Sequence, residues 1–260
     1  MKINFQKYQG TGNDFVMIDN RLGEYNDINS QMVELLCDRR FGIGADGLIL
    51  LEHAENVAFK MRYFNRDGKE ASMCGNGGRC IAAFAAKLQI VPLNTVFEFV
   101  AVDGIHQAKV NNSFISLKMS DVAEIKKFDD GFFLDTGSPH FVTLRDNIEK
   151  IDVFNEGKKL RNDSRFEIIG GANINFVNIC KNGSLSVRTF ERGVEDETLA
   201  CGTGSVASAI VAHHLDKSRS EFDINVLGGQ LKVKLKEHKS GIFSDIWLEG
   251  KAEFVFEGTI

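Results

Sequence analysis

Two cysteines in the chain begin the same kind of motif: a thiol, a glycine-rich turn and then a run of small, mostly apolar residues. The first is Cys74 in CGNGG at 74–78, and the second is Cys201 in CGTGS at 201–205. A helix that starts at such a turn offers unpaired backbone N–H groups and the positive end of its dipole. A thiol held there has a lowered pKa, and the glycines let a carboxylate approach the N–H groups. The pair of motifs therefore indicates thiol acid–base chemistry on a carboxylate-bearing substrate.

Further motifs repeat around the two cysteines with nearly constant spacing. RYFNR at 62–66 is echoed by RTFER at 188–192, and GAD at 44–46 is echoed by GAN at 171–173. The offset is 126 residues between Arg66 and Arg192 and 127 residues between the two cysteines. Spacing kept across about half of a 260-residue chain indicates an internal duplication. We therefore expect two halves that contribute to one site.

The composition excludes several classes of protein. A hydrophobic content of 43% and a charged content of 26% are typical of a soluble globular protein. The formal net charge of −5 and the lack of a basic run argue against nucleic acid or an anionic membrane as a partner. No apolar run approaches the roughly 18 residues of a membrane span. Five cysteines without a secretory signal favour a reducing, cytoplasmic location.

Strands and buried helices are expected to position the cysteines. Apolar patterning predicts strands over 3–8 and 15–19, and a helix capped by Ser30 whose apolar positions are Met32, Leu35 and Leu36. The segments 81–88 and 206–215 have almost no polar stripe, so we expect helices that are buried on all sides.

The expected fold class is α+β, with two pseudo-symmetric halves that each curl a mixed sheet around a central buried helix. Residues 1–117 form the first half and carry Cys74, and residues 118–248 form the second and carry Cys201. The strand pattern at 252–256 has no counterpart before the junction of the halves. We therefore expect the segment 249–260 to return to the first half.

These motifs resemble those of a known family, the cofactor-independent diaminopimelate epimerases. The resemblance covers essentially the whole chain and is carried by GNDF at 12–15, GIGAD at 42–46, FNRDG at 64–68, MCGNG at 73–77, PH at 139–140, ERG at 191–193 and CGTG at 201–204. It implies two pseudo-symmetric α/β domains that interconvert LL- and meso-2,6-diaminopimelate, for lysine and peptidoglycan synthesis. It also implies that the enzyme needs no cofactor and no metal.

Epimerisation explains the need for two thiols. A thiolate removes the α-proton from one face of the carbon, and a thiol returns a proton to the other face. The resemblance implies that Cys74 and Cys201 are this pair. It assigns the substrate carboxylate to the backbone amides at the two helix starts, namely Gly75, Asn76, Gly202 and Thr203.

The resemblance also assigns roles to side chains. His140 and Glu191 would tune the thiols, and Glu191 would also contact the substrate. The substrate-binding asparagines would be Asn13, Asn65 and Asn173. Arg192 would grip the second carboxylate with its guanidinium, because a planar fork matches a carboxylate, and Arg66 is its echo.

Several cysteines and two positions stand outside this pattern. Cys37, Cys80 and Cys180 have no echo, and we expect them to be core residues. Gly47 stands where the family often has glutamine, and Ser138 stands where it often has asparagine.

Other functions are compatible with parts of the sequence. The main alternative is a related two-cysteine racemase of another amino acid, such as histidine or proline. A cysteine hydrolase that uses Cys201 with His140 would leave the Cys74 motif without a purpose, and an amino-acid-binding protein would not need both cysteines. The sequence leaves open the exact substrate, the cysteine that rests as thiolate, and the oligomeric state, including a homodimer.

Overall fold

The computed structural model describes residues 2–112, 114–239 and 241–260, and the chain divides into two compact units. Unit 1 comprises Met1–Leu117 together with Gly250–Ile260, and unit 2 comprises Lys118–Glu249. Glu249, expected in the first half, therefore belongs to unit 2.

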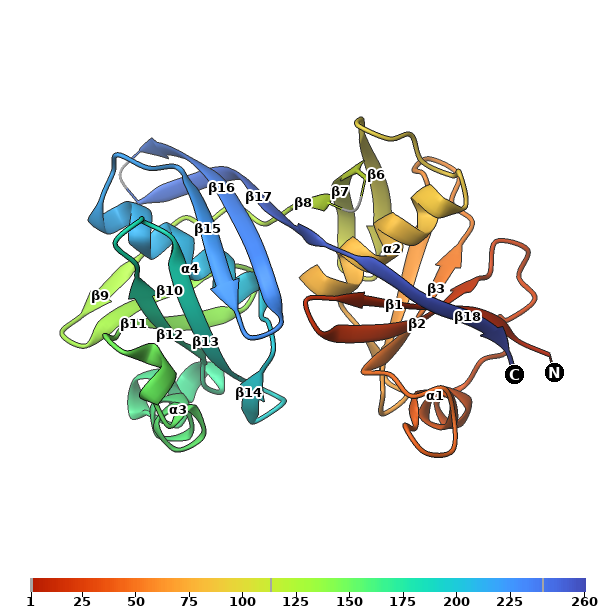
Figure 1. Ribbon diagram of the computed structural model, residues 1–260, viewed down its shortest axis with the longest axis horizontal. Coiled ribbons are helices and arrows are strands. Elements are labelled where there is room, and N and C mark those ends of the chain that lie inside the picture. Colours follow the sequence, from red (N-terminus) through yellow and green to blue (C-terminus); the bar gives the residue numbers. More distant parts are fainter. Residues whose placement is uncertain (1, 113, 240) are drawn as a thin grey trace. The chain divides into compact units, whose positions relative to one another are not determined.

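The described part of unit 1 is built mainly of strands, with two α-helices (Figure 1). In chain order its elements are β1 (Asn4–Gly10), β2 (Asn13–Asp19), α1 (Ser30–Cys37), β3 (Gly47–Glu52), β4 (Lys60–Asn65), β5 (Glu70–Ala71), α2 (Gly75–Lys87), β6 (Val96–Ala101), β7 (Gly104–Asn111), β8 (Phe114–Lys118) and, near the C-terminus, β18 (Glu253–Thr259).

The sheet of unit 1 is mixed and surrounds helix α2. Strand β1 pairs antiparallel with both β18 and β2, β2 runs parallel to β3, and β3 is antiparallel to β4. Strand β4 is parallel to β6, which is antiparallel to β7. Helix α2 contacts β1, β2, β3, β7 and β18. Strand β18, near the C-terminus, pairs with β1 and so belongs to the sheet of unit 1.

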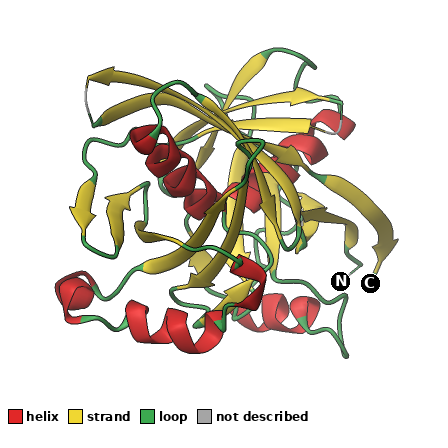
Figure 2. Ribbon diagram, turned by 60° about the vertical axis from the view of Figure 1, so that its left-hand side comes forward, coloured by secondary structure: helices red, strands yellow, loops and turns green. Residues whose placement is uncertain are grey.

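Unit 2 is also strand-rich, with short helices on its outside (Figure 2). Its elements are β9 (Lys126–Phe128), β10 (Gly131–Asp135), β11 (Pro139–Leu144), η1 (Ile148–Lys150), α3 (Val153–Arg161), η2 (Ser164–Ile169), β12 (Asn173–Ile179), β13 (Leu185–Glu191), β14 (Asp196–Thr198), α4 (Gly202–Leu215), β15 (Glu221–Val226), β16 (Gly229–Lys239) and β17 (Ile242–Lys251).

The strand pairings of unit 2 repeat those of unit 1. Strands β10 and β11 pair antiparallel as β1 and β2 do, and β11 and β12 are parallel as β2 and β3 are. The antiparallel pair β12–β13, the parallel pair β13–β15 and the antiparallel pair β15–β16 follow in the same order. Helix α4 contacts β10 to β13, β15 and β16. The prediction of an α+β fold with two pseudo-symmetric halves, each around a central helix, is confirmed.

The two central helices begin earlier than the apolar runs suggested. Each starts directly after its cysteine, at Gly75 and at Gly202, and so includes the glycine-rich turn. The small residues of both helices are buried because strands surround them. Helix α2 nevertheless buries a charged residue, Arg79, which is 0% exposed.

Helix α1 differs in detail from its prediction. Its N-cap is Asn29, whose side chain accepts a hydrogen bond of 3.0 Å from the Met32 N–H. The buried face holds Val33 and Leu36, whereas Leu35 is 56% exposed. In the part of the chain that the structure describes, no helix combines the length and the apolar character needed to cross a membrane.

Candidate active site

Cys74 occupies the N-cap of helix α2 and is partly exposed. Its backbone is extended, with φ −100° and ψ 147°, and its Sγ accepts a hydrogen bond from the Gly77 N–H over 3.2 Å. A Cβ at position 77 would lie 3.2 Å from that sulfur, so glycine keeps the approach open. The first turn of the helix thus presents an amide directly to the Cys74 sulfur, and such a contact stabilises a thiolate.

Two of the predicted substrate-binding residues meet beside this helix start. Asn76 donates from Nδ2 to Asn13 Oδ1 over 3.2 Å. Asn13 follows a two-residue turn between β1 and β2, in which Thr11 and Gly12 have φ of 51° and 86°. Positive φ at both positions is typical of the tightest hairpins. The hairpin therefore fixes Asn13 next to the amides that follow Cys74.

Charged side chains hold Asn13 in place through Asp46. Asn13 donates to Asp46 over 2.7 Å, and Arg39 bridges Asp46 and Asp14 with contacts of 2.8 and 2.7 Å. Lys7, only 5% exposed, pairs with Asp14 at 2.8 Å. Burial raises the pKa of Asp14, but hydrogen bonds and charge from Arg39 and Lys7 outweigh it and hold the pKa well below its ordinary range.

The end of strand β4 explains the glycine at position 47. Tyr63 donates from its hydroxyl to Asn65 Oδ1 over 2.7 Å, and Gly47 lies opposite Asn65 in the neighbouring strand. A Cβ at position 47 would come within 2.6 Å of both the Tyr63 ring and the Phe64 carbonyl. The tyrosine therefore occupies the space that a longer residue at 47 would need. Sequence reasoning missed Tyr63, although it shares a strand face with Asn65.

Arg66, the echo of Arg192, follows this strand and is exposed. Its backbone N–H donates to the Asp46 carbonyl over 3.1 Å.

In unit 2, Cys201 occupies the N-cap of α4 and is 8% exposed. Its Sγ lies 3.5 Å from the Thr203 hydroxyl. The Thr136 hydroxyl donates to the Thr203 carbonyl over 3.2 Å, which ties the β10–β11 turn to the first turn of the helix. A Cβ at Gly204 would lie 3.3 Å from the sulfur and 2.3 Å from Asn175 Oδ1, so Asn175 approaches the helix start closely.

His140 reaches this region through Asn175. It is fully buried on β11, and its Nδ1 accepts from Asn175 Nδ2 over 2.9 Å, because an amide nitrogen can only donate. Thr189 donates to Asn175 Oδ1 over 3.0 Å. Burial lowers the pKa of His140 to about 3, although the Asn175 hydrogen bond opposes this. His140 is therefore a neutral imidazole at neutral pH, and Asn175, which sequence reasoning missed, links it to the start of α4.

Asn173, at the start of β12, lies beside Arg192, which directly follows β13. Asn173 donates to the Ser138 hydroxyl over 2.8 Å and accepts from the Arg192 backbone N–H over 2.8 Å. The Arg192 Nη1 donates to the carbonyls of Ile169 and Gly171 over 3.0 and 3.3 Å. These carbonyls hold one nitrogen of the guanidinium, and within the described residues Arg192 makes no ion pair with a carboxylate.

Glu191 precedes Arg192 on strand β13. Its Oε2 accepts from the Thr198 hydroxyl over 2.9 Å. Burial raises the pKa of Glu191, and the Thr198 hydrogen bond partly opposes the rise. A carboxyl with a raised pKa can exchange protons closer to neutral pH than an exposed glutamate can.

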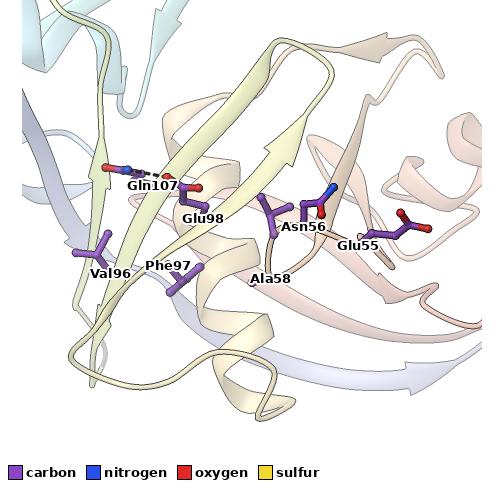
Figure 3. Close-up of a pocket in the computed structure, with 8 residues that line it drawn as sticks. Glu55, Asn56, Ala58, Val96, Phe97, Glu98 and Gln107 are labelled. Atoms are coloured by element: carbon purple, nitrogen blue, oxygen red, sulfur yellow. Dashed lines mark hydrogen bonds between the residues drawn. The ribbon is translucent and has the colours of Figure 1, made fainter.

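A surface groove lies in unit 1 (Figure 3). It is lined by Glu55, Asn56, Val57, Ala58, Val96, Phe97, Glu98 and Gln107. Gln107 donates to Glu98, its neighbour across the β6–β7 pair, over 2.9 Å. None of the predicted site residues lines this groove. Among the described residues, no group of three or more His, Cys, Asp or Glu side chains is arranged to hold a metal ion.

Comparison with known proteins agrees with the residues that surround the two cysteines. The family model for diaminopimelate epimerase matches residues 5–121 and 132–255. The chain belongs to the diaminopimelate epimerase family. The diaminopimelate epimerase of Flavobacterium psychrophilum is 53% identical, over 98% of this chain and 98% of its own length. That of Chlorobaculum tepidum is 42% identical, over 96% of this chain and 98% of its own.

A solved structure shows that the fold extends beyond this family. The PhzF-family phenazine biosynthesis protein of Bacillus anthracis superposes with a TM-score of 0.78, covering 100% of this chain and 99% of that one. Its sequence identity is 15%, so the likeness is one of fold.

Proposed function

We propose that this chain interconverts LL- and meso-2,6-diaminopimelate, with Cys74 and Cys201 as the acid–base pair. Membership of the diaminopimelate epimerase family supports the reaction, as does the 53% identity to a relative of that name. The observation that carries the mechanism is the placement of each cysteine at the N-cap of the central helix of its own unit. A product of this reaction would enter lysine and peptidoglycan synthesis in the cytoplasm.

The proposed reaction moves one proton at a time. A thiolate takes the α-proton, and the electron pair of the broken C–H bond stays on the carbon. The other thiol then gives its proton to the opposite face, which inverts the carbon and exchanges the roles of Cys74 and Cys201. The negative charge that develops next to the carboxylate requires stabilisation, which preorganised N–H groups can supply. The amides that would do so are those of Gly75, Asn76, Gly202 and Thr203.

The remaining predicted residues would orient the substrate. Asn13, Asn65 and Asn173 offer amide groups that can donate or accept, and each is already fixed by a neighbouring side chain. Arg192 would bind the carboxylate at the far end of the substrate. Glu191 would contact substrate and tune a thiol, and His140 would act on the thiol as a neutral group.

The experiment that tests this function follows LL-diaminopimelate in deuterated water with purified protein. Early product should carry deuterium at the inverted carbon, whereas recovered substrate should not, because each thiol serves one face. Cys74→Ala and Cys201→Ala should each lower the rate by about 10²- to 10⁴-fold. The matched control is Cys80→Ala, a buried thiol of α2 outside the proposed pair, which should stay active. Comparable turnover of lysine, histidine or proline would favour a racemase of another amino acid.

A further inference from the structure

Among the described residues, Arg79 is the largest fully buried side chain, and it lies on α2 just over one turn after Cys74. Its guanidinium donates to the Gly75 carbonyl over 3.1 Å, to Asn76 Oδ1 over 2.8 Å and to the Thr11 hydroxyl over 2.9 Å. Each of these acceptors is neutral, and each belongs to the helix start or to the β1–β2 turn. Arg79 therefore places a positive charge next to the first turn of α2, which follows Cys74.

This charge is not neutralised by a carboxylate. Within residues 2–112, 114–239 and 241–260, no ion pair involves Arg79, and its buried Nε has no hydrogen-bond partner. Burial lowers the pKa of Arg79, and negative charge on Cys80 or Cys74 raises it. A guanidinium nevertheless stays protonated in proteins. Because a buried cation without a counter-charge is costly, a nearby anion would stabilise the fold.

Two thiols of α2 could provide that anion. Cys80 is 0% exposed, and burial raises its pKa far above the ordinary value despite the charge of Arg79, so it stays neutral. Cys74 is partly exposed, stands at the positive end of the helix dipole and already accepts an N–H from Gly77. Cys74 is thus the thiol that can carry the negative charge.

We infer that Arg79 is a positioning residue that makes Cys74 the resting thiolate of the pair, which leaves Cys201 as the resting thiol. The inference rests on the proposed function for its meaning in catalysis. The duplication supports it, since the offset of 127 residues that relates Cys74 to Cys201 places Val206 where α2 has Arg79. Helix α4 therefore has an aliphatic residue at the equivalent position, and this asymmetry separates the two thiols.

Most other titratable groups on elements that pack against α2 are neutral or paired with an opposite charge. They are Tyr8 on β1, Asp14 with Lys7 and Arg39 and Asp19 with Arg21 at β2, Glu52 with Lys60 at β3, His106 with Asp103 at β7, and Glu253 with Lys251 and Glu257 with Lys87 at β18. Lys109 on β7 alternates with the buried Ala108 and Val110 and so lies on the opposite face of that strand from them. Asp103 also accepts from the Met73 N–H over 3.3 Å, so its charge opposes a thiolate at Cys74. The other described cation on α2, Lys87, lies in its last turn and pairs with Glu257, so Arg79 is the charge on this helix that can outweigh Asp103.

The test measures the rate of alkylation by iodoacetamide against pH, separately at Cys74 and Cys201, by peptide mass spectrometry. Only the thiolate reacts, so the midpoint of each profile gives the pKa of that thiol, whereas the accessibility of the sulfur changes only the height of the profile. In the wild type, the Cys74 midpoint should lie below that of Cys201 by at least about one pH unit. Arg79→Met should raise the Cys74 midpoint by about 1–3 units and leave the Cys201 midpoint in place. Arg79→Lys should keep it near the wild-type value, because the charge remains.

The matched control is Arg62→Met, which removes a cation paired with Glu70 on strands β4 and β5 and should move neither midpoint. An unchanged Cys74 midpoint in folded Arg79→Met would overturn the inference. If that variant does not fold, the wild-type comparison decides, and a Cys74 midpoint at or above that of Cys201 would overturn it equally. Epimerisation is assayed on the same wild-type sample. Active protein with the wrong order of midpoints refutes the role of Arg79 alone, whereas inactive protein refutes the proposed function alone.

Discussion

Asn173 donates a hydrogen bond to the hydroxyl of Ser138 over 2.8 Å. The equivalent pair of residues in unit 1 is also hydrogen-bonded, but there the donor and the acceptor are exchanged. In unit 1, Asn13 donates to Asp46 over 2.7 Å. The repeat places Asn173 at the position of Asp46 and Ser138 at that of Asn13. The serine, a departure from the family pattern, therefore still fixes the side chain that the proposed function assigns to the substrate.

Ser138→Ala should leave the Asn173 amide nitrogen with only its 3.1 Å bond to the Pro139 carbonyl. The loosened side chain should raise KM for diaminopimelate by about 2- to 10-fold, the equivalent of one neutral hydrogen bond. The melting temperature should change little, because Asn173 keeps its bond to the Arg192 N–H. Steady-state kinetics check this against Ser184→Ala, which removes a hydroxyl from the exposed β12–β13 turn. Equal KM values for the two variants would show that Ser138 does not support the substrate.

Tyr63→Phe should likewise raise KM by about 2- to 10-fold, because Asn65 loses the hydroxyl that sets the direction of its amide. The ring remains, so packing against Phe15 and stability should be kept. Tyr25→Phe, which also removes a hydroxyl from a tyrosine of unit 1, is the control. A drop in kcat without a change in KM would contradict a role in substrate binding.

Arg192→Lys should lower kcat/KM by about 10- to 100-fold, because a point charge cannot reproduce a bidentate fork. The lysine would also lose the two carbonyl contacts that hold the guanidinium. Arg165→Lys, in an exposed cluster with Asp130 and Asp163, should leave the kinetics unchanged. Wild-type activity in Arg192→Lys would show that Arg192 does not bind the substrate.

Asp14 should make the stability of the protein depend on pH. Its pKa is depressed in the folded state, so its contribution is complete above the ordinary value of 3.8 and is lost as the pH falls below it. Asp14→Asn should destabilise the protein at neutral pH by more than the roughly 1 kcal/mol of an exposed pair but less than the 3–5 kcal/mol of a fully buried one.

Urea unfolding of wild type and variant between about pH 6 and pH 3 measures this contribution. The difference between the two should shrink toward the acid end. Asp27→Asn, an exposed aspartate outside the described ion pairs, is the control. A difference that stays constant with pH would mean that the Asp14 charge does not contribute.

Much of the architecture followed from local patterns. The predicted strands at 3–8 and 15–19 overlap β1 and β2, and the strand near the C-terminus pairs with β1. The starts of the two central helices were missed, because glycines have low helix propensity and a cap by cysteine is unusual. For α1, the side-chain cap by Asn29 placed the start, and periodicity misassigned Leu35 to the core.

The supporting residues of the site were harder to predict. Tyr63, Arg79 and Asn175 act through contacts that depend on how strands and helix pack, and no repeat in the sequence marks them. Arg79 is a charged residue in an otherwise apolar helix, which made it conspicuous in the sequence. Arginine is mostly exposed in proteins, however, so the sequence did not indicate that it is buried. The site residues in the repeated motifs could be predicted because the two copies keep the same spacing.

The pairing of β18 with β1 sets the order in which the nascent chain can complete its two units. Strand β1 leaves the ribosome before unit 2, whereas its partner Glu253–Thr259 follows unit 2. The sheet of unit 1 therefore keeps an open edge at β1 until β18 is synthesised, while unit 2, continuous over Lys118–Glu249, can fold as soon as it emerges. An exposed strand edge is a template for association with other chains. The nascent chain is thus most vulnerable to aggregation at β1, until β18 arrives to cover it.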